Sequence, residues 1–196
     1  MSVDRSVAAS DLVMAGGPMR PGRVLPVVAA PAQVLSTRSV PVDPTDRQIV
    51  QLCADLVATM QVSPGCVGLA AVQVGIAAQV FCVDVSGHPK TGTCHGLIVL
   101  VNAEVVQASR MERAREGCLS VPDLTGDVKR AGRLTVRGQR PGSLDPVELS
   151  TDAFEARALQ HEIDHCSGLL FLDRVAGAHA IFNRKTYLPG PPATVA

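Results

Sequence analysis

The sequence predicts an α+β fold, in which antiparallel β-sheets pack around a central helix near the C-terminus. Three observations support this prediction: β-rich runs dominate the middle of the chain, turn-forming residues separate them, and a helical pattern without glycine or proline follows. An order of strands first and a helix late is typical of a helix packed against an antiparallel sheet. At 196 residues the chain is long enough for one good core and short for two.

The first elements are an amphipathic helix and a pair of strands. The helix is expected at 44–60, because apolar residues recur at helical spacing at positions 49, 52, 53, 56 and 60. Strands are expected at 79–85 and 97–102. The glycine- and proline-containing segment 87–92 lies between them and suits a hairpin or a longer loop.

The later elements are three strands and the second helix. The strands are expected at 105–108, 127–138 and 146–150, and Pro141-Gly142 marks the turn between the last two. The second helix begins after Thr151 or Asp152, either of which suits the N-cap, and Glu155 supplies a first-turn carboxylate.

Composition favours a single cytoplasmic enzyme domain at 23–188, between a flexible N-terminal segment, 1–22, and a flexible C-terminal tail, 189–196. Eighteen basic and eighteen acidic residues cancel, so no global charge attracts nucleic acid or an anionic membrane. The apolar runs are far shorter than the roughly 20 residues of a membrane span, and the N-terminus lacks the apolar core of an export signal. Six irregularly spaced cysteines indicate reduced thiols rather than a disulfide framework.

The segment Gln160-His161-Glu162-Ile163-Asp164-His165 predicts a metal-dependent hydrolase. Residues four apart lie on one face of a helix, so His161 and His165 can bind one ion while Glu162 lies at its edge. Glu162 then suits the role of general base, and later of the acid that protonates the leaving nitrogen.

The third metal ligand is expected upstream of this helix. The long zinc-protease pattern needs a third histidine at a position that is Phe171 here. No glutamate follows Glu162, which excludes the scheme in which a later helix supplies one. Two upstream segments are unusual enough to be candidates: Glu116-Gly117-Cys118-Leu119-Ser120-Val121-Pro122 and Val67-Gly68-Leu69-Ala70-Ala71-Val72-Gln73-Val74-Gly75.

Together with the histidine helix, these two segments resemble the three signature motifs of the peptide deformylase family, in order and at plausible separations. The resemblance covers about residues 24–173. It implies that Cys118 joins His161 and His165 and leaves a fourth position for water, and it assigns the oxyanion donors to the Leu119 backbone N–H and the Gln73 side-chain amide.

The resemblance also implies the substrate, which is the N-terminal formylmethionine of nascent chains, and one divalent metal ion, most often Fe²⁺ with Zn²⁺, Ni²⁺ or Co²⁺ acceptable to the same ligands. Phe154 and Ala158 lie on the same general side of the helix as the histidines and are candidates to line a methionine pocket. Backbone groups of Val67, Gly68 and Gly117 are candidates to bind an extended peptide. Any ribosome contact would be local and transient.

One further prediction concerns the support of the metal ligands. Asp164 cannot share the metal face of the helix fully and is expected to pair with Arg130 in a neighbouring strand, with Glu116 as a second carboxylate nearby.

The chain departs from the family pattern at four positions. Cys66 replaces a glycine, Val72 stands where proline is common, and Asp123 stands where glycine is common. No arginine occurs three residues after Pro122, where many family members have one. Two other interpretations stay open: a zinc peptidase, and a deformylase-like protein that binds metal or peptide without turnover.

Overall fold

The computed structural model describes residues 21–92 and 94–185. The expected C-terminal tail and all but the last two residues of the expected N-terminal segment lie outside the described residues, and the domain limits stay a prediction. None of the helices in the described part of the chain is long and apolar enough to cross a membrane.

The strands form one antiparallel sheet. They are β1 (Gly68–Ala70), β2 (Val80–Val83), β3 (Ile98–Cys118), β4 (Val121–Gln139), β5 (Pro146–Asp152) and β6 (Ile181–Asn183). The order in the sheet is β1-β2-β3-β4-β5, and β6 pairs with β4. All of these pairs are antiparallel.

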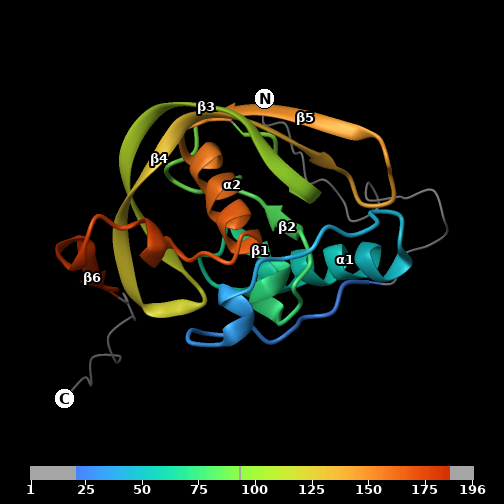
Figure 1. Cartoon of the computed structure of the whole chain (residues 1–196), viewed down its shortest axis with the longest axis horizontal. Coiled ribbons are helices and arrows are strands. Elements are labelled where there is room, and N and C mark those ends of the chain that lie inside the picture. The colour runs from blue at the N-terminus through green and yellow to red at the C-terminus, as the bar shows by residue number, and fades with distance from the viewer. Residues whose placement is uncertain (1–20, 93, 186–196) are drawn as a thin grey trace, which may run out of the picture.

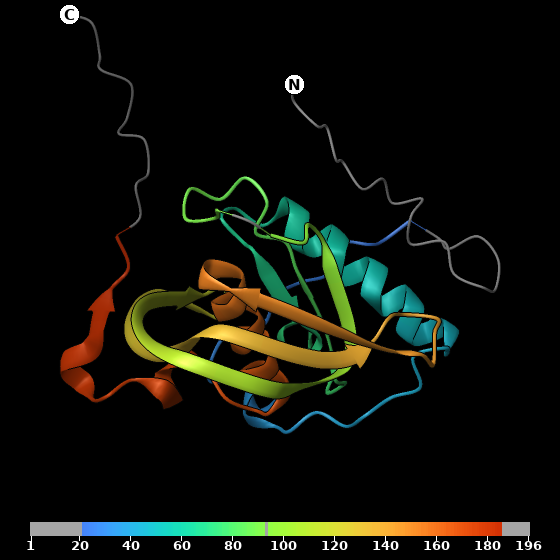
Figure 2. The same ribbon diagram turned by 90° about the horizontal axis from the view of Figure 1, so that it is seen from above.

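The described residues also form two α-helices, α1 (Arg47–Val62) and α2 (Ala153–Cys166), and four 3₁₀ helices (Gln33–Ser36, Ala71–Val74, Phe171–Arg174 and Ala178–Ala180). In Figure 1, β3, β4 and β5 arch over one side of α2, while β1 and β2 lie on its other side, toward α1. Figure 2 shows the same layers from above, with α2 behind the long β3 and β4 ribbons. The predicted α+β class, with antiparallel strands around a central helix, is confirmed.

Both predicted helices exist, with small shifts at their ends. The first begins at Arg47 rather than at residue 44, because Asp46 occupies the N-cap and its carboxylate accepts the Gln48 backbone N–H at 2.8 Å. At the second helix Asp152 holds the N-cap position without a side-chain capping bond. Thr151 instead donates its hydroxyl to the Glu155 carboxylate at 2.6 Å.

The strands expected at 97–102 and 105–108 are one strand, so the expected break between them is wrong. The register of β3 against β4 shifts between Val101 and Glu104 and again between Val105 and Gln107. These irregularities interrupt the alternation of apolar and polar residues by which a strand is recognised in a sequence. Residues 104–113 of the strand are exposed on both faces, and the ion pairs of Arg113 and Arg115 with Asp127 hold this end of β3 to β4. The strand expected at 127–138 likewise begins earlier, at Val121.

The core lies on both sides of β2. One cluster joins α2 to the sheet and includes Leu159, Phe81 and Leu134. A second cluster joins α1 to the opposite side and includes Leu56. Helix α2 is therefore packed along its length, and the histidines that it carries stand on a rigid element.

Candidate active site

Cys118, His161 and His165 come together at one point. Each offers one ligand atom, and these three atoms lie within 4.8 Å of one another. The Cys118 Sγ is 3.2 Å from the His165 Nε2, and the two imidazole rings meet edge to face with centroids 4.9 Å apart. Burial lowers the pKa of His165 well below its ordinary value, so this ring stays neutral and able to bind a cation.

The chain brings these ligands together through two tight local structures. Helix α2 places its two histidines one turn apart on one face. Cys118 ends β3, and Leu119 and Ser120 form the turn that leads into β4, so the cysteine lies at the tip of a long hairpin. One thiolate and two imidazoles with room for a further ligand are the donor set of a catalytic divalent metal.

Charged side chains behind the ligands hold them in place. Glu116 accepts from the His161 Nδ1 at 2.9 Å, which turns the other ring nitrogen toward the cluster. Arg130 donates to both Glu116 oxygens, at 2.8 and 2.9 Å, and also pairs with Asp164. Burial alone would raise the pKa of Glu116, but its hydrogen bonds with Arg130 and His161 outweigh burial and lower it to about 2. Glu116 is therefore an anion at neutral pH.

Sequence reasoning named Asp164, Arg130 and Glu116 for this support, and the structure brings the three together. It missed Arg174, at the end of the 3₁₀ helix Phe171–Arg174, which donates to both Asp164 oxygens at 2.6 and 3.0 Å. An aspartate carboxylate can accept more hydrogen bonds than one arginine donates to it. A second cation for Asp164 could therefore have been sought nearby in the sequence, and Arg174 lies ten residues later.

Glu162 is a buried carboxyl group beside the cluster. Its side chain has an exposed fraction of only 3%, and its Oε2 has no hydrogen-bond partner among the described residues. Burial raises the pKa of Glu162 to about 7 against the opposing effect of His161. A carboxyl group in this range exchanges protons near neutral pH, and a bound divalent cation would lower this raised pKa.

Gln73 reaches the cluster from the other side of α2. Its side-chain N–H group lies 3.4 Å from the Cys118 Sγ and 3.3 Å from the Ser120 Oγ. Its carbonyl oxygen accepts the Ala70 backbone N–H at 2.9 Å, which fixes which end of the amide faces the site. The amide donor thus points at the cluster, as an oxyanion donor must.

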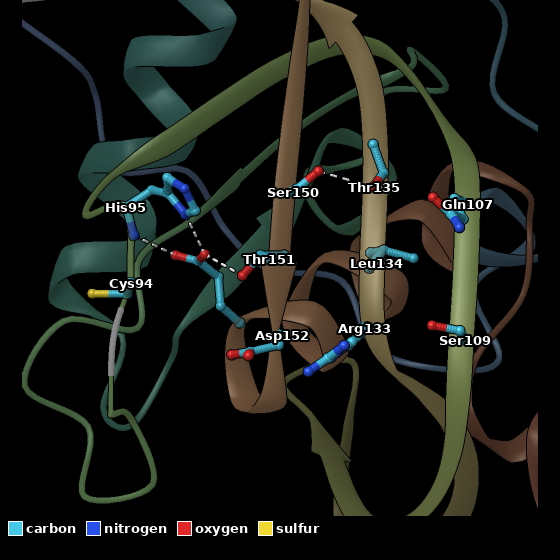
Figure 3. A pocket seen from close by; sticks show the side chains of 11 residues that line it. Cys94, His95, Gln107, Ser109, Arg133, Leu134, Thr135, Ser150, Thr151 and Asp152 are labelled. Atoms are coloured by element: carbon cyan, nitrogen blue, oxygen red, sulfur yellow. Dashed lines mark hydrogen bonds and ion pairs between the residues drawn. The ribbon is translucent and has the colours of Figure 1, made fainter.

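The cluster opens into a pocket of about 270 Å³. All of the predicted substrate-binding residues line it: Val67, Gly68, Gly117, Phe154 and Ala158. A larger groove of about 610 Å³ lies elsewhere and contains none of the metal cluster. Figure 3 shows this second groove, where a buried glutamate, Glu155, accepts from His95 and Thr151. The buried carboxylate of this larger groove, Glu155, already has hydrogen-bond partners, whereas the buried Glu162 of the smaller pocket has an oxygen without one. The smaller pocket is therefore the better candidate for the catalytic site.

The departures from the family pattern leave the cluster intact. Burial raises the pKa of the Cys66 thiol to about 12, and its sulfur lies 3.1 Å from the Gly68 carbonyl oxygen rather than among the ligands. Val72 is fully buried in the core. The Asp123 carbonyl accepts the Arg184 backbone N–H at 2.8 Å.

Comparison with known proteins agrees with this geometry. The sequence model of the polypeptide deformylase family matches residues 24–180. The peptide deformylase of Halothermothrix orenii is 42% identical over 142 residues, which cover 72% of this chain and 87% of that protein. Peptide deformylase 1 of Bacillus cereus is 40% identical, covering 78% and 92% of the two chains.

Solved structures give the same result. The peptide deformylase of Thermotoga maritima superposes with a TM-score of 0.71 at 31% identity, covering 79% of this chain and 99% of that one. A class I type b peptide deformylase of Acinetobacter baumannii bound to Met-Ala-Ser gives 0.71 at 35% identity, covering 77% and 99%. Sequence, fold and metal cluster lead to one conclusion: this chain belongs to the peptide deformylase family.

Proposed function

We propose that this chain is a metal-dependent hydrolase that removes the formyl group from the N-terminal methionine of newly synthesised polypeptides and releases formate. The observation that carries the proposal is the unpartnered, buried Glu162 carboxyl group beside the Cys118, His161 and His165 cluster. Metal binding alone does not need that carboxyl group, whereas hydrolysis of an amide needs a proton acceptor there.

Different side chains bind the metal ion, transfer the proton and stabilise the oxyanion. Cys118, His161 and His165 would hold the ion, which when bound supplies Lewis acidity that lowers the pKa of water and polarises the formyl carbonyl. Glu162 accepts the proton from the attacking water and returns it to the methionine nitrogen as the carbon–nitrogen bond breaks. The Gln73 amide and the Leu119 backbone N–H donate to the oxyanion that develops on the formyl oxygen.

Peptide binding is assigned to the walls of the same pocket. Backbone groups of Val67, Gly68 and Gly117 suit an extended peptide that adds as a strand beside them. Phe154 and Ala158 offer apolar surface for the methionine side chain.

The finer assignments belong to this proposal as well. Fe²⁺ is the proposed ion, and Zn²⁺, Ni²⁺ or Co²⁺ suit the same cysteine and histidine ligands. The proposed location is the cytoplasm, where nascent chains are made, with at most a transient ribosome contact.

Incubation of the metal-loaded protein under anaerobic conditions with formyl-Met-Ala-Ser and with Met-Ala-Ser tests the function. Formate without cleaved peptide supports the proposal. Cleavage of either peptide bond would indicate a zinc peptidase, and binding without any product would indicate a protein that does not turn over. Glu162→Gln should retain the ion but lose nearly all formate release, because an amide cannot carry the proton.

A further inference from the structure

Basic side chains gather on one wall of the active-site pocket, around Phe154. The His88 ring stacks on Phe154 with centroids 4.2 Å apart. The Lys90 Nζ lies 5.9 Å, and the Arg157 Cζ 5.3 Å, from the centroid of the same ring. One aromatic ring thus holds two permanent cations and an imidazole together at the mouth of the pocket.

A third permanent cation lines the same pocket. Arg184 follows β6 and lines the pocket, where its Nη2 donates to the Cys118 carbonyl oxygen at 2.9 Å. Its Nε is buried and has no hydrogen-bond partner among the described residues. Arg184 lies near Thr125, the position three residues after Pro122 at which the sequence lacks the family's arginine: a Cβ built on Gly117 would contact side-chain atoms of both residues.

Carboxylates do not neutralise these cations. The carboxylates that line the pocket are Glu116 and Glu162. Glu116 is engaged by Arg130 and His161, and Glu162 is the proposed base. None of the ion pairs among the described residues includes Lys90, Arg157 or Arg184.

The positive charges of Lys90 and Arg157 act on the neighbouring His88 imidazole. Burial lowers the pKa of His88, and the charges of Lys90 and Arg157 lower it further. The chain as a whole has equal numbers of acidic and basic residues, so this field belongs to the pocket mouth and not to the net charge of the protein.

The basic wall lies within reach of the residues that follow the methionine. Arg157 precedes His161 by four residues on α2, which is about 6 Å along the helix. An extended peptide advances about 3.3 Å per residue, so the two residues that follow the methionine span about the same distance from the metal cluster as Arg157 does.

We infer that the pocket mouth selects nascent chains with aspartate or glutamate in the positions directly after the formylmethionine, with Lys90 and Arg157 as the specificity-determining residues. This inference rests on the proposed function. Carboxylates entering the pocket meet the two cations around Phe154 and the Arg184 guanidinium, which also lines the pocket, and each pair gains from the partly enclosed setting.

Three peptides with amidated C-termini, which remove the terminal carboxylate, test the inference on the metal-loaded enzyme: formyl-Met-Asp-Asp, formyl-Met-Ala-Ser and formyl-Met-Lys-Lys. We expect kcat/KM for formate release to be about tenfold higher for the acidic than for the neutral peptide at low salt, and lower for the basic one. At about 0.5 M salt the ratio should shrink, because the charges are screened.

Two double variants test whether Lys90 and Arg157 cause the preference for acidic peptides. In the double variant Lys90→Gln/Arg157→Gln the acidic-to-neutral ratio should fall toward one, and Lys90→Glu/Arg157→Glu should bring it below one. The matched control, Lys129→Gln/Arg133→Gln, removes one lysine and one arginine that are exposed and do not line this pocket; Arg133 lies in the other groove (Figure 3). This control should keep the wild-type ratio.

Equal or inverted kcat/KM values in the wild-type enzyme, or a ratio that the double variant leaves unchanged, overturn the selectivity while formate release from formyl-Met-Ala-Ser still upholds the proposed function. Failure to release formate from any of the three peptides overturns both.

Discussion

Gly68→Ala should disable the enzyme through a single methyl group. A Cβ built on Gly68 would lie 2.5 Å from the Glu162 Oε1 and 2.9 Å from its Cδ. Gly68 begins β1 and pairs with Val83 in an extended conformation that alanine also adopts. The new methyl group therefore strains the proposed base and not the backbone that carries it.

The size of the effect follows from these distances. Ordinary contact between such atoms is about 3.5 Å, so the Glu162 carboxyl group must move by about 1 Å. It is buried and cannot swing into solvent. A displacement of about 1 Å in a positioned catalytic group costs on the order of 100-fold in rate, and kcat should fall by that amount while the ligand atoms stay in place.

The assay compares kcat for formyl-Met-Ala-Ser, metal content and Tm in Gly68→Ala, in the wild type and in Gly92→Ala. Gly92 has no heavy atom within 4 Å of a built Cβ and does not line the pocket, so Gly92→Ala should keep both kcat and metal. A Gly68→Ala enzyme with kcat within about threefold of wild type would refute the reasoning, because it would mean that the carboxyl position does not control the rate. Loss of bound metal in Gly68→Ala would point to a different cause, a disturbed cluster.

Three further predictions test a metal ligand, the support of the ligands, and an ion pair on helix α1. Cys118→Ser should abolish the sulfur-to-metal charge-transfer band of the cobalt-substituted protein, and a surviving band would identify Cys66 or another thiolate as the ligand. Asp164→Asn should weaken metal affinity by about 10–100-fold in competition with a chelator, because Asp164 ties the histidine helix to its neighbours; unchanged affinity would exclude that role. The third prediction concerns Asp55, which accepts from the Arg23 backbone and guanidinium: burial alone would raise its pKa, but these bonds lower the pKa below its ordinary value. The contact therefore stabilises the fold above the ordinary pKa of the carboxyl group and stops doing so as pH falls through the lowered pKa. Asp55→Asn should lower the Tm at pH 7, and this deficit should shrink as pH falls through the lowered pKa of the carboxyl group; a deficit that is independent of pH would contradict the argument.

The parts of the site that sequence could predict are those set by local geometry. The histidine spacing places two ligands on one face of α2 whatever surrounds the helix. The position of Glu162 beside them follows from the same spacing. Cys118 and Gln73 lie far from α2 in the sequence, and only their resemblance to known motifs related them to the histidines, because no periodicity connects residues on different elements.

Other features depend on tertiary structure, which the sequence pattern does not contain. The length of β3 was underestimated because residues 104–113 are exposed on both faces, so pairing with β4 holds this stretch and no buried side marks it in the sequence. β1 and β6 are three-residue strands, too short for any alternation to be recognised. The contact of Gly68 with Glu162 arises only when β1 packs beside α2.

The charged network behind the ligands explains why the site can be rigid although Cys118 stands at a hairpin tip. Arg130 on β4 has an exposed fraction of 4% and binds carboxylates from β3 and α2 at once, through Glu116 and Asp164. Removal of either carboxylate would leave a buried cation undercompensated, which costs far more than the pair contributes when complete. The hairpin that carries the thiol and the helix that carries the imidazoles are thus held in one arrangement by groups that do not touch the ion. Metal affinity should therefore depend on this network as strongly as on the ligands' own chemistry, and loss of the network should release the ion before the fold is lost.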